Sequence, residues 1–365
     1  MQDHDLPAVR RLALGDLFFL LVCVFGRADI NRDWLFDRAR EVQAEPDGCL
    51  DLWSREHYKS TIITYGLTIQ DILNNPELTV GIFSHTRPIA KKFLRQIKQE
   101  FENNELLKLI FPDIIHQKPQ SEALKWSEDN GIVVKRRTNP KEATVEAWGL
   151  VDGQPIGAHY GLMVFDDVVT RASVTTPEMI EKTTDAWELA QALSSDGGRI
   201  RHVGTRYHYN DTYKTIIDRK AAKVRLYPGT DNGMPDGKPV LFSQEYLEKK
   251  RRDMGNYTFA CQILQNPRAD VVDGFDENWL LFWPAQHHRG LNTYILVDPA
   301  NEKKKRSDYT SMWCVGYGED ENFMVVDMLR DRLNLEERTR VLMAWHRDYR
   351  PLRVGYEKYG MQADI

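Results

Sequence analysis

The stretch LDLWSREHYKST, Leu50 to Thr61, has the outline of a phosphate-binding loop between a strand and a helix. Such a loop follows the pattern G-x-x-x-x-G-K-[ST]. When its lysine is aligned with Lys59, Trp53 and Tyr58 stand in place of the two glycines. Lys59 and Ser60 supply the ammonium that neutralises phosphates and the hydroxyl that binds Mg²⁺. Since glycine lets a backbone approach phosphates closely, this stretch alone is more often an ordinary strand–loop–helix connection.

The composition describes a globular chain without a bias toward nucleic acid. Its 365 residues are long for one domain and suit two, with 42% hydrophobic and 28% charged residues. A net charge of −5 gives no overall attraction to DNA, so DNA contacts must use local patches. The four cysteines have no C-x-x-C spacing, which argues against a zinc site and a disulfide framework and fits a reducing cytoplasm.

An apolar run near the N-terminus, Leu17–Phe25, follows basic residues as in a signal peptide. However, Asp16 interrupts its front, no A-x-A cleavage pattern follows, and the run is far short of the roughly 20 residues of a membrane span. We therefore predict a buried N-terminal helix over Arg10–Arg27 and no membrane association.

Strand-like and helix-like segments alternate through the first two thirds of the chain. Strands are predicted at Cys49–Trp53, Leu78–Ser84, Gly161–Phe165 and Arg199–Thr205, and helices at Lys59–Asn74 and Pro88–Glu102. This alternation predicts an α/β fold with a parallel sheet flanked by helices on both faces. Ligands in such sheets gather at the carboxyl ends of strands, where Lys59, Asp166 and Thr205 fall.

The segment LMVFDD, Leu162–Asp167, is an apolar strand followed by two carboxylates. In P-loop enzymes one acid of such a pair holds Mg²⁺ and its neighbour orients the attacking water. A strand that ends in a solvated acidic turn is the plainer alternative. Because this segment follows the Lys59 loop in an alternating chain, we interpret the two motifs together as a P-loop NTPase domain.

The C-terminal quarter has a different order of elements. Strands are predicted at Thr293–Ala300, Thr310–Gly318, Asn322–Leu329 and Leu352–Glu357, with a helix at Asn334–Tyr349. Three meandering strands, a helix and a fourth strand is the order of a ribonuclease-H-like domain. Carboxylates at the ends of adjacent strands there hold Mg²⁺ for phosphodiester hydrolysis, and Asp298 and Glu357 occupy such ends. Asp308 and Asp327 are additional candidates.

We accordingly predict three regions. Residues 1–266 form an N-terminal helical segment with the P-loop ATPase domain, residues 267–290 form a linker, and residues 291–365 begin a ribonuclease-H-like nuclease domain. Since the chain stops shortly after Glu357, we expect this nuclease domain to be truncated and to lack a third carboxylate, with weak metal binding and weak DNA cleavage.

Five segments in this order resemble one protein family. They are the loop from Ser54 to Ser60, VFDD, HVGTRYH (His202–His208), FACQILQNP (Phe259–Pro267) and LVDPA. Together they resemble the large terminase subunit of tailed bacteriophages and prophages, from about Trp34 to the end of the chain.

The resemblance implies a motor for viral genome packaging. In that family the protein uses ATP and Mg²⁺ to move double-stranded DNA into a procapsid, and a nuclease with Mg²⁺ or Mn²⁺ cuts concatemeric DNA. It implies a soluble protein of the bacterial host cytoplasm that is transiently bound to the capsid. The implied partners are double-stranded DNA, the portal of the procapsid, the small terminase subunit and further copies of the chain in a ring.

The resemblance also assigns roles to residues. ATP binding is implied for Ser54, Arg55, Lys59, Ser60 and Thr61, catalysis for Arg55, Asp167, Asp298 and Glu357, coupling of hydrolysis to movement for Gly204, Thr205 and Arg206, and metal binding for Ser60, Asp166, Asp298, Glu357 and, as an additional ligand, Asp308. Arg55 would contact the γ-phosphate.

Three departures from the family pattern keep alternatives open. Tyr58 stands where many members have glycine, and Asp167 stands where glutamate is usual. His159 lies near where a subunit-bridging arginine is sought, and Arg136 and Arg137 are the alternatives for that role, which stays unassigned. The alternatives are a helicase-like, DNA-stimulated ATPase and a prophage remnant that binds DNA or capsid without catalysis.

Overall fold

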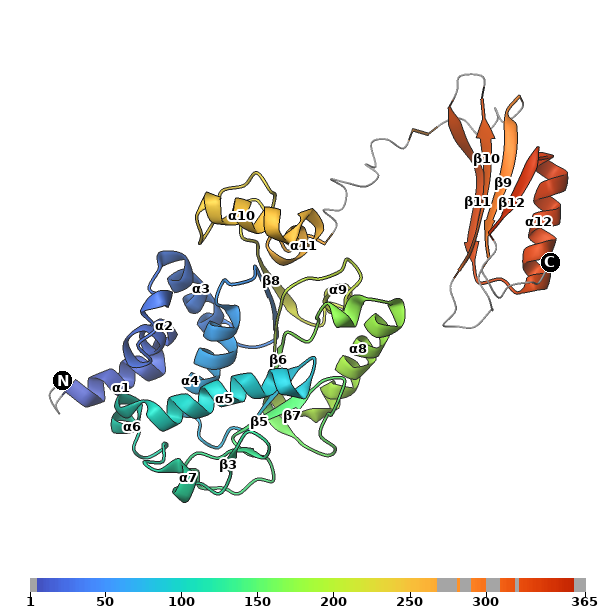
Figure 1. Cartoon of the computed structure of the whole chain (residues 1–365). Coiled ribbons are helices and arrows are strands. Elements are labelled where there is room, and N and C mark those ends of the chain that lie inside the picture. The colour runs from blue at the N-terminus through green and yellow to red at the C-terminus, as the bar shows by residue number, and fades with distance from the viewer. Residues whose placement is uncertain (1–4, 268–280, 283–289, 300–308, 319–321, 358–365) are drawn as a thin grey trace. The chain divides into compact units, whose positions relative to one another are not determined.

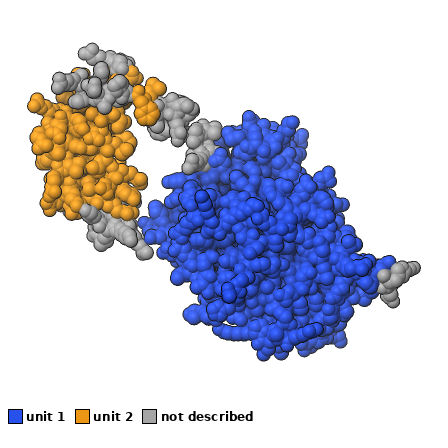
Figure 2. Space-filling view, turned by 180° about the vertical axis from the view of Figure 1, so that it is seen from behind, with its two compact units in different colours: residues 1–275 blue, residues 276–365 orange. Residues whose placement is uncertain are grey.

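The computed structural model describes residues 5–267, 281–282, 290–299, 309–318 and 322–357. The chain divides into two compact units, residues 1–275 and 276–365, which Figure 2 colours separately. Most of the predicted linker, residues 267–290, lies outside the described residues, so the predicted domain limits stay predictions.

The first unit is built on a sheet of eight strands. Their order is β3 (Trp126–Ser127), β4 (Gly131–Ile132), β5 (Val145–Gly149), β2 (Val80–Ser84), β6 (Tyr160–Asp166), β7 (Ser194–Gly204), β1 (Cys49–Trp53) and β8 (Lys223–Tyr227). All neighbours from β5 to β8 are parallel, whereas β3, β4 and β5 pair antiparallel. The predicted α/β fold with a parallel sheet is confirmed.

Alternate residues of each strand point to opposite faces of this sheet. On β6, Leu162 and Val164 join one core cluster, and Met163 and Phe165 join another. Helices cover both faces (Figure 1). The first cluster packs beneath α1 (Leu6–Gly15), α2 (Leu17–Phe19), α3 (Asp33–Ala44), α4 (Thr68–Asn74), α5 (Arg87–Asn103) and α6 (Glu105–Ile110), and the second beneath α8 (Pro177–Ala190) and α9 (Thr212–Asp218). Three further helices are α7 (Pro119–Glu122), α10 (Gln244–Met254) and α11 (Asn256–Gln262).

The N-terminal apolar run is buried as predicted, but it does not form a single helix. Asp16 ends α1 in an extended conformation, and its side chain caps the next helix by accepting from the Phe19 amide. Leu20–Val24 continues as a π-helix, and Leu17 and Leu20 are fully buried. No helix within the described residues is long and apolar enough to cross a membrane.

The helix after the opening loop ends at Asn74 as predicted, but Thr61–Leu67 is π-helical. This stretch packs tightly against the N-terminal run, because a Cβ added to Gly66 would lie 2.6 Å from Leu21 Cδ2. π-helical turns within a helix often lie at functional sites.

The second unit contains a four-stranded sheet in the order β11 (Phe323–Asp331), β10 (Thr310–Tyr317), β9 (Asn292–Asp298) and β12 (Arg353–Tyr356). The first three strands form an antiparallel meander, and β12 is parallel to β9. Helix α12 (Leu335–Tyr349) begins with a capping box between Asn334 and Glu337. The predicted order of elements is confirmed, and the nuclease activity stays a prediction.

Candidate nucleotide-binding site

Three neighbouring strands bring the candidate residues of the first unit to one edge of the sheet. Strand β7 lies between β1, which precedes the opening loop, and β6, which ends in the two acids. All three strands run parallel, so their carboxyl ends share this edge. The predicted meeting of the Lys59 loop, Asp166 and Thr205 therefore follows from the strand order.

The loop adopts a backbone conformation that glycine usually takes. Tyr58 has φ 61° and Glu56 has φ 65°, both in the left-handed region. For an L-residue this conformation costs roughly 1–2 kcal/mol. The Tyr58 ring packs against the first core cluster, and this contact offsets part of the cost. Trp53, aligned with the first glycine, instead lies buried in β1.

A backbone hydrogen bond to β8 and a buried histidine hold the loop in place. The Ser54 amide donates to the Tyr227 carbonyl at 2.8 Å. The His57 ring packs edge-on against Trp34 and Phe242, and its Nδ1 donates to the Arg55 carbonyl at 2.9 Å. Burial lowers the pKa of His57 to about 4, so the ring is neutral at pH 7.

The first acid of the pair is joined to the helix that follows the loop. Asp166 is fully buried, and Ser60 Oγ donates to its Oδ1 at 3.0 Å. Thr64 donates to the other carboxylate oxygen. Burial raises the pKa of Asp166, and the negative charge of Asp167 raises it further. Sequence reasoning missed Thr64, although it lies one helical turn after Ser60.

The second acid lies closer to solvent and faces the loop lysine. Lys59 Nζ is 3.9 Å from Asp167 Oδ1, and the exposed fractions of these side chains are 9% and 39%. Asp167 has φ 49°, and its amide donates to the Val203 carbonyl of β7 at 2.9 Å. An ammonium and an accessible carboxylate therefore face each other above the buried Ser60–Asp166 pair. Thr61, the other hydroxyl candidate, begins the π-helical stretch.

The loop arginine is held by two neutral side chains. Arg55 Nη1 donates to Tyr207 Oη at 2.9 Å and to Gln262 Oε1 at 3.3 Å. Tyr207 follows β7 and Gln262 ends α11, and sequence reasoning singled out neither side chain. The Arg55 amide also donates to the Gln262 carbonyl at 2.9 Å, so the loop is bonded directly to α11.

The predicted coupling residues end β7 and enter the following loop. A Cβ on Gly204 would lie 2.1 Å from Tyr213 Oη, so only glycine fits there. Thr205 is buried, and Arg206 Nε pairs with Asp211 Oδ2 at 3.0 Å. The coupling role of these residues stays a prediction.

In the second unit, Asp298 and Glu357 line one cavity of about 430 Å³ together with Ser311 and Trp313. Ser311 is the cross-strand partner of Asp298 in the sheet. Asp308 lies outside the described residues. Within the described part of the chain, no group of three or more His, Cys, Asp or Glu residues is arranged to hold a metal ion.

Several solved structures are similar to this chain. The large terminase from a thermophilic bacteriophage, in complex with ADP, is 16% identical, with a TM-score of 0.38, over 83% of this chain and 69% of that chain. The chain is similar to large terminases of bacteriophages. The large terminase of the same phage in complex with ATP-γ-S is 15% identical, with a TM-score of 0.37, over 85% of this chain and 72% of that chain.

A third structure is a mutant of the large terminase ATPase domain from Thermus phage P74-26. It is 13% identical, with a TM-score of 0.37, over 62% of this chain and 91% of that chain. No family model and no curated protein matches the chain. Large terminases are also the family that the ordered sequence motifs resemble.

Proposed function

We propose that this chain is an ATP-driven motor subunit that moves double-stranded DNA into a procapsid, as the large terminase family does. One observation carries the proposal: the Ser60–Asp166 hydrogen bond and the Lys59–Asp167 pair meet at one edge of a parallel sheet. The strand order brings the loop and the acids to one edge, and the specific contacts there match the needs of phosphoryl transfer: a hydroxyl on the buried acid and an ammonium facing the accessible acid.

The residues of the site have different roles in phosphoryl transfer. Lys59 binds the β- and γ-phosphates together with loop amides at the start of a helix. Asp167, the more exposed acid, orients the attacking water and accepts its proton. Arg55, which Tyr207 and Gln262 hold beside the loop, contacts the γ-phosphate.

The paired oxygens of Ser60 and Asp166 fit a Mg²⁺ ion, which prefers oxygen ligands. When bound, Mg²⁺ would neutralise charge on the nucleotide phosphates. Its positive charge would also favour the ionised form of the buried Asp166 carboxyl, whose pKa is raised.

Phosphate release from ATP, measured with and without double-stranded DNA, tests the motor. We expect Mg²⁺-dependent turnover that DNA stimulates. Absence of turnover by the folded chain would favour the remnant that binds DNA or capsid without catalysis. Turnover with duplex unwinding, measured by strand displacement, would favour the helicase-like ATPase instead.

We also propose that the second unit cuts concatemeric DNA with Mg²⁺ or Mn²⁺. The proposal is supported by Asp298 and Glu357, which line one cavity at the ends of β9 and β12. Oxygen ligands of this kind position metal ions for phosphodiester hydrolysis. Plasmid cleavage in Mn²⁺ tests it: we expect cleavage by this chain to be weak, and Asp298→Asn should remove it. Cleavage that survives this substitution would place the nuclease elsewhere.

The proposed partners are the portal of the procapsid and the small terminase subunit, with further copies of the chain forming a ring in the host cytoplasm. Sedimentation of the chain with and without purified portal tests this assembly. A chain that neither sediments with the portal nor assembles on it would contradict the packaging role while leaving ATP turnover intact.

A further inference from the structure

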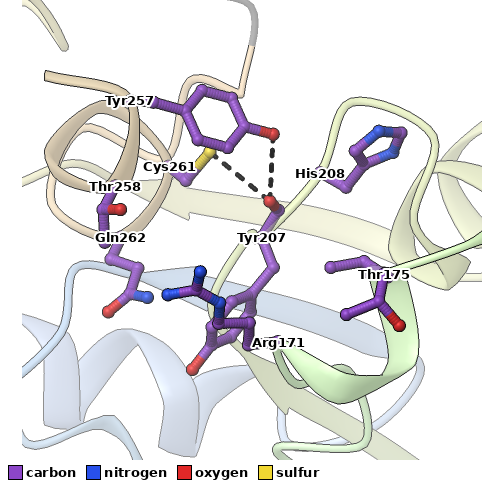
Figure 3. Close-up of a pocket in the computed structure, with 9 residues that line it drawn as sticks. Arg171, Thr175, Tyr207, His208, Tyr257, Thr258, Cys261 and Gln262 are labelled. Atoms are coloured by element: carbon purple, nitrogen blue, oxygen red, sulfur yellow. Dashed lines mark hydrogen bonds between the residues drawn. The ribbon is translucent and has the colours of Figure 1, made fainter.

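A second pocket adjoins the candidate nucleotide site. Its volume is about 290 Å³, and it lies between the connection after β6, the loop after β7 and helix α11 (Figure 3). Nine residues line it: Arg171, Val174, Thr175, Tyr207, His208, Tyr257, Thr258, Cys261 and Gln262.

Hydrogen bonds join two of the segments that line the pocket. Tyr257 Oη donates to the Tyr207 carbonyl at 3.2 Å, and Cys261 Sγ lies 3.6 Å from the same oxygen (Figure 3). Both side chains come from α11, whereas Tyr207 follows β7. The pocket is therefore a built feature of the fold rather than a gap between loose loops.

The lining favours a negatively charged ligand. None of the nine lining residues is acidic, and Arg171 contributes a positive charge. Among the described residues, the Arg171 guanidinium makes neither an ion pair nor a hydrogen bond. His208 Nδ1 accepts from the Asn210 amide at 3.1 Å, so the proton of the neutral ring is on Nε2, a further donor. Tyr257 Oη and Thr175 Oγ1 already donate to the Tyr207 and Ala172 carbonyls, at 3.2 and 3.1 Å. Among the lining hydroxyls, that of Thr258 therefore completes the set of donors.

The pocket also shares residues with the γ-phosphate end of the site. Tyr207 and Gln262 line the pocket, and the same two side chains hold Arg55. Arg171 lies shortly after the Asp166–Asp167 pair in the chain. A phosphate group that leaves the space between Lys59, Arg55 and Asp167 would therefore pass this pocket.

We propose that this pocket binds a phosphate group, and specifically the inorganic phosphate released from ATP on its way to solvent. Arg171 is the principal charged contact. Since one water occupies about 30 Å³, the cavity has room for a phosphate with several waters. The inference rests on the proposed ATPase. A phosphodiester of DNA has the same chemistry, so the experiment must separate the two sources.

The test is equilibrium binding of radioactive inorganic phosphate to the full chain, without nucleotide turnover. Arg171→Ala should weaken phosphate binding about ten- to hundredfold, as expected for loss of a hydrogen bond to a charged group. His208→Gln should weaken it less. Arg11→Ala, which removes an exposed arginine from α1, is the matched control and should leave phosphate binding unchanged.

Lys59→Ala and ADP binding separate this pocket from the loop. If the pocket binds phosphate, Lys59→Ala loses ADP but keeps phosphate, and Arg171→Ala loses phosphate but keeps ADP. If phosphate binding is lost in Lys59→Ala and kept in Arg171→Ala, the proposal that this pocket binds phosphate is wrong. A chain that never binds ADP would contradict the proposed function, whereas the phosphate result would still decide the pocket.

A short DNA duplex is the second arm. If Arg171→Ala weakens duplex binding but not binding of inorganic phosphate, the pocket takes the DNA backbone and the proposed product site is wrong. If inorganic phosphate binding is lost and duplex binding is unchanged, the product site is supported.

Discussion

Among single residues, Tyr58 gives the most direct test of the loop backbone. Its φ of 61° suits glycine, whereas the ring packs on the core. Both Tyr58→Gly and Tyr58→Ala lose the ring, but only alanine keeps the cost of the left-handed conformation. We expect the glycine variant to be about 1 kcal/mol more stable than the alanine variant in urea unfolding.

Phe93 in α5 provides the matched control, since it is also partly buried against the same cluster. In a helix interior, alanine is the more stable of the two by about 1 kcal/mol. Phe93→Ala should therefore be more stable than Phe93→Gly. The same order at both positions would mean that Tyr58 does not hold a left-handed backbone in solution.

Lys59 is the residue on which the nucleotide assignment depends most. Lys59→Ala removes a preorganised charge from the developing γ-phosphate, a loss of about 3 kcal/mol or a hundredfold or more in turnover. The measurement is phosphate release at saturating ATP. Turnover within a few-fold of the unsubstituted chain would refute the phosphate-loop assignment.

Asp167 separates hydrolysis from binding. Asp167→Asn should retain ATP binding and lose hydrolysis, because Asp166 and its bond to Ser60 remain intact. Asparagine also tolerates the φ of 49° at this position. Binding is measured with a fluorescent ATP analogue and hydrolysis by phosphate release. Loss of binding with normal folding would mean that the two acids have exchanged roles.

Among the elements, the pairing of β1 with β8 stabilises the strand that precedes the loop. Asp51 and Arg225 are register partners in these strands, and both are buried. Arg225 donates to the two carboxylate oxygens of Asp51 at 2.8 and 2.6 Å. Asp51→Ala leaves a buried guanidinium without its carboxylate partner and should destabilise the first unit by about 3–5 kcal/mol.

A double variant distinguishes loss of the ion pair from the cost of leaving one buried charge without its partner. Replacing both partners by apolar residues, Asp51→Val with Arg225→Leu, should cost less than Asp51→Ala alone, because no charge is left buried. Thermal and urea unfolding measure both. A double variant that is less stable than the single one would show that the ion pair itself stabilises the strand pair.

For the stability of the entire first unit, His57 predicts a specific pH dependence. Burial lowers its pKa in the folded protein to about 4, whereas in the unfolded chain it is about 6.5. The unfolded state alone therefore gains the proton as the pH falls from 6.5 to 4. At pH 5 this should cost about 2 kcal/mol of folding free energy relative to pH 7.

The comparison must be made with His57→Gln, because the raised pKa of Asp166 contributes with the opposite sign. Between pH 7 and pH 5 the unsubstituted chain should lose about 2 kcal/mol more stability than His57→Gln. His159→Gln, at an exposed position of the first unit, should follow the unsubstituted chain. Parallel profiles for the unsubstituted chain and His57→Gln would show that the ring is protonated in the folded state.

Much of the sheet and part of the site could be predicted from local pattern. Buried runs followed by polar turns located β1, β2, β6 and the meander of the second unit, because a strand is defined by a few consecutive residues. The break at Asp16 and the π-helical stretch at Thr61–Leu67 were missed. The break at Asp16 comes with a side-chain cap on the Phe19 amide, and the π-helical stretch packs tightly against Leu21 of the N-terminal run, a contact that the sequence pattern does not show.

Local sequence was sufficient to identify Lys59, Ser60 and the two acids as candidates, since each stands at the end of a strand or the start of a helix. The strand order, the left-handed Tyr58 and the Thr64–Asp166 bond came only from the folded chain. So did the contacts of Arg55 with Tyr207 and Gln262 and the pocket beside Arg171. These features join segments that are far apart along the chain, and their geometry is set by the packing of helices on both faces of one sheet rather than by any neighbouring residues.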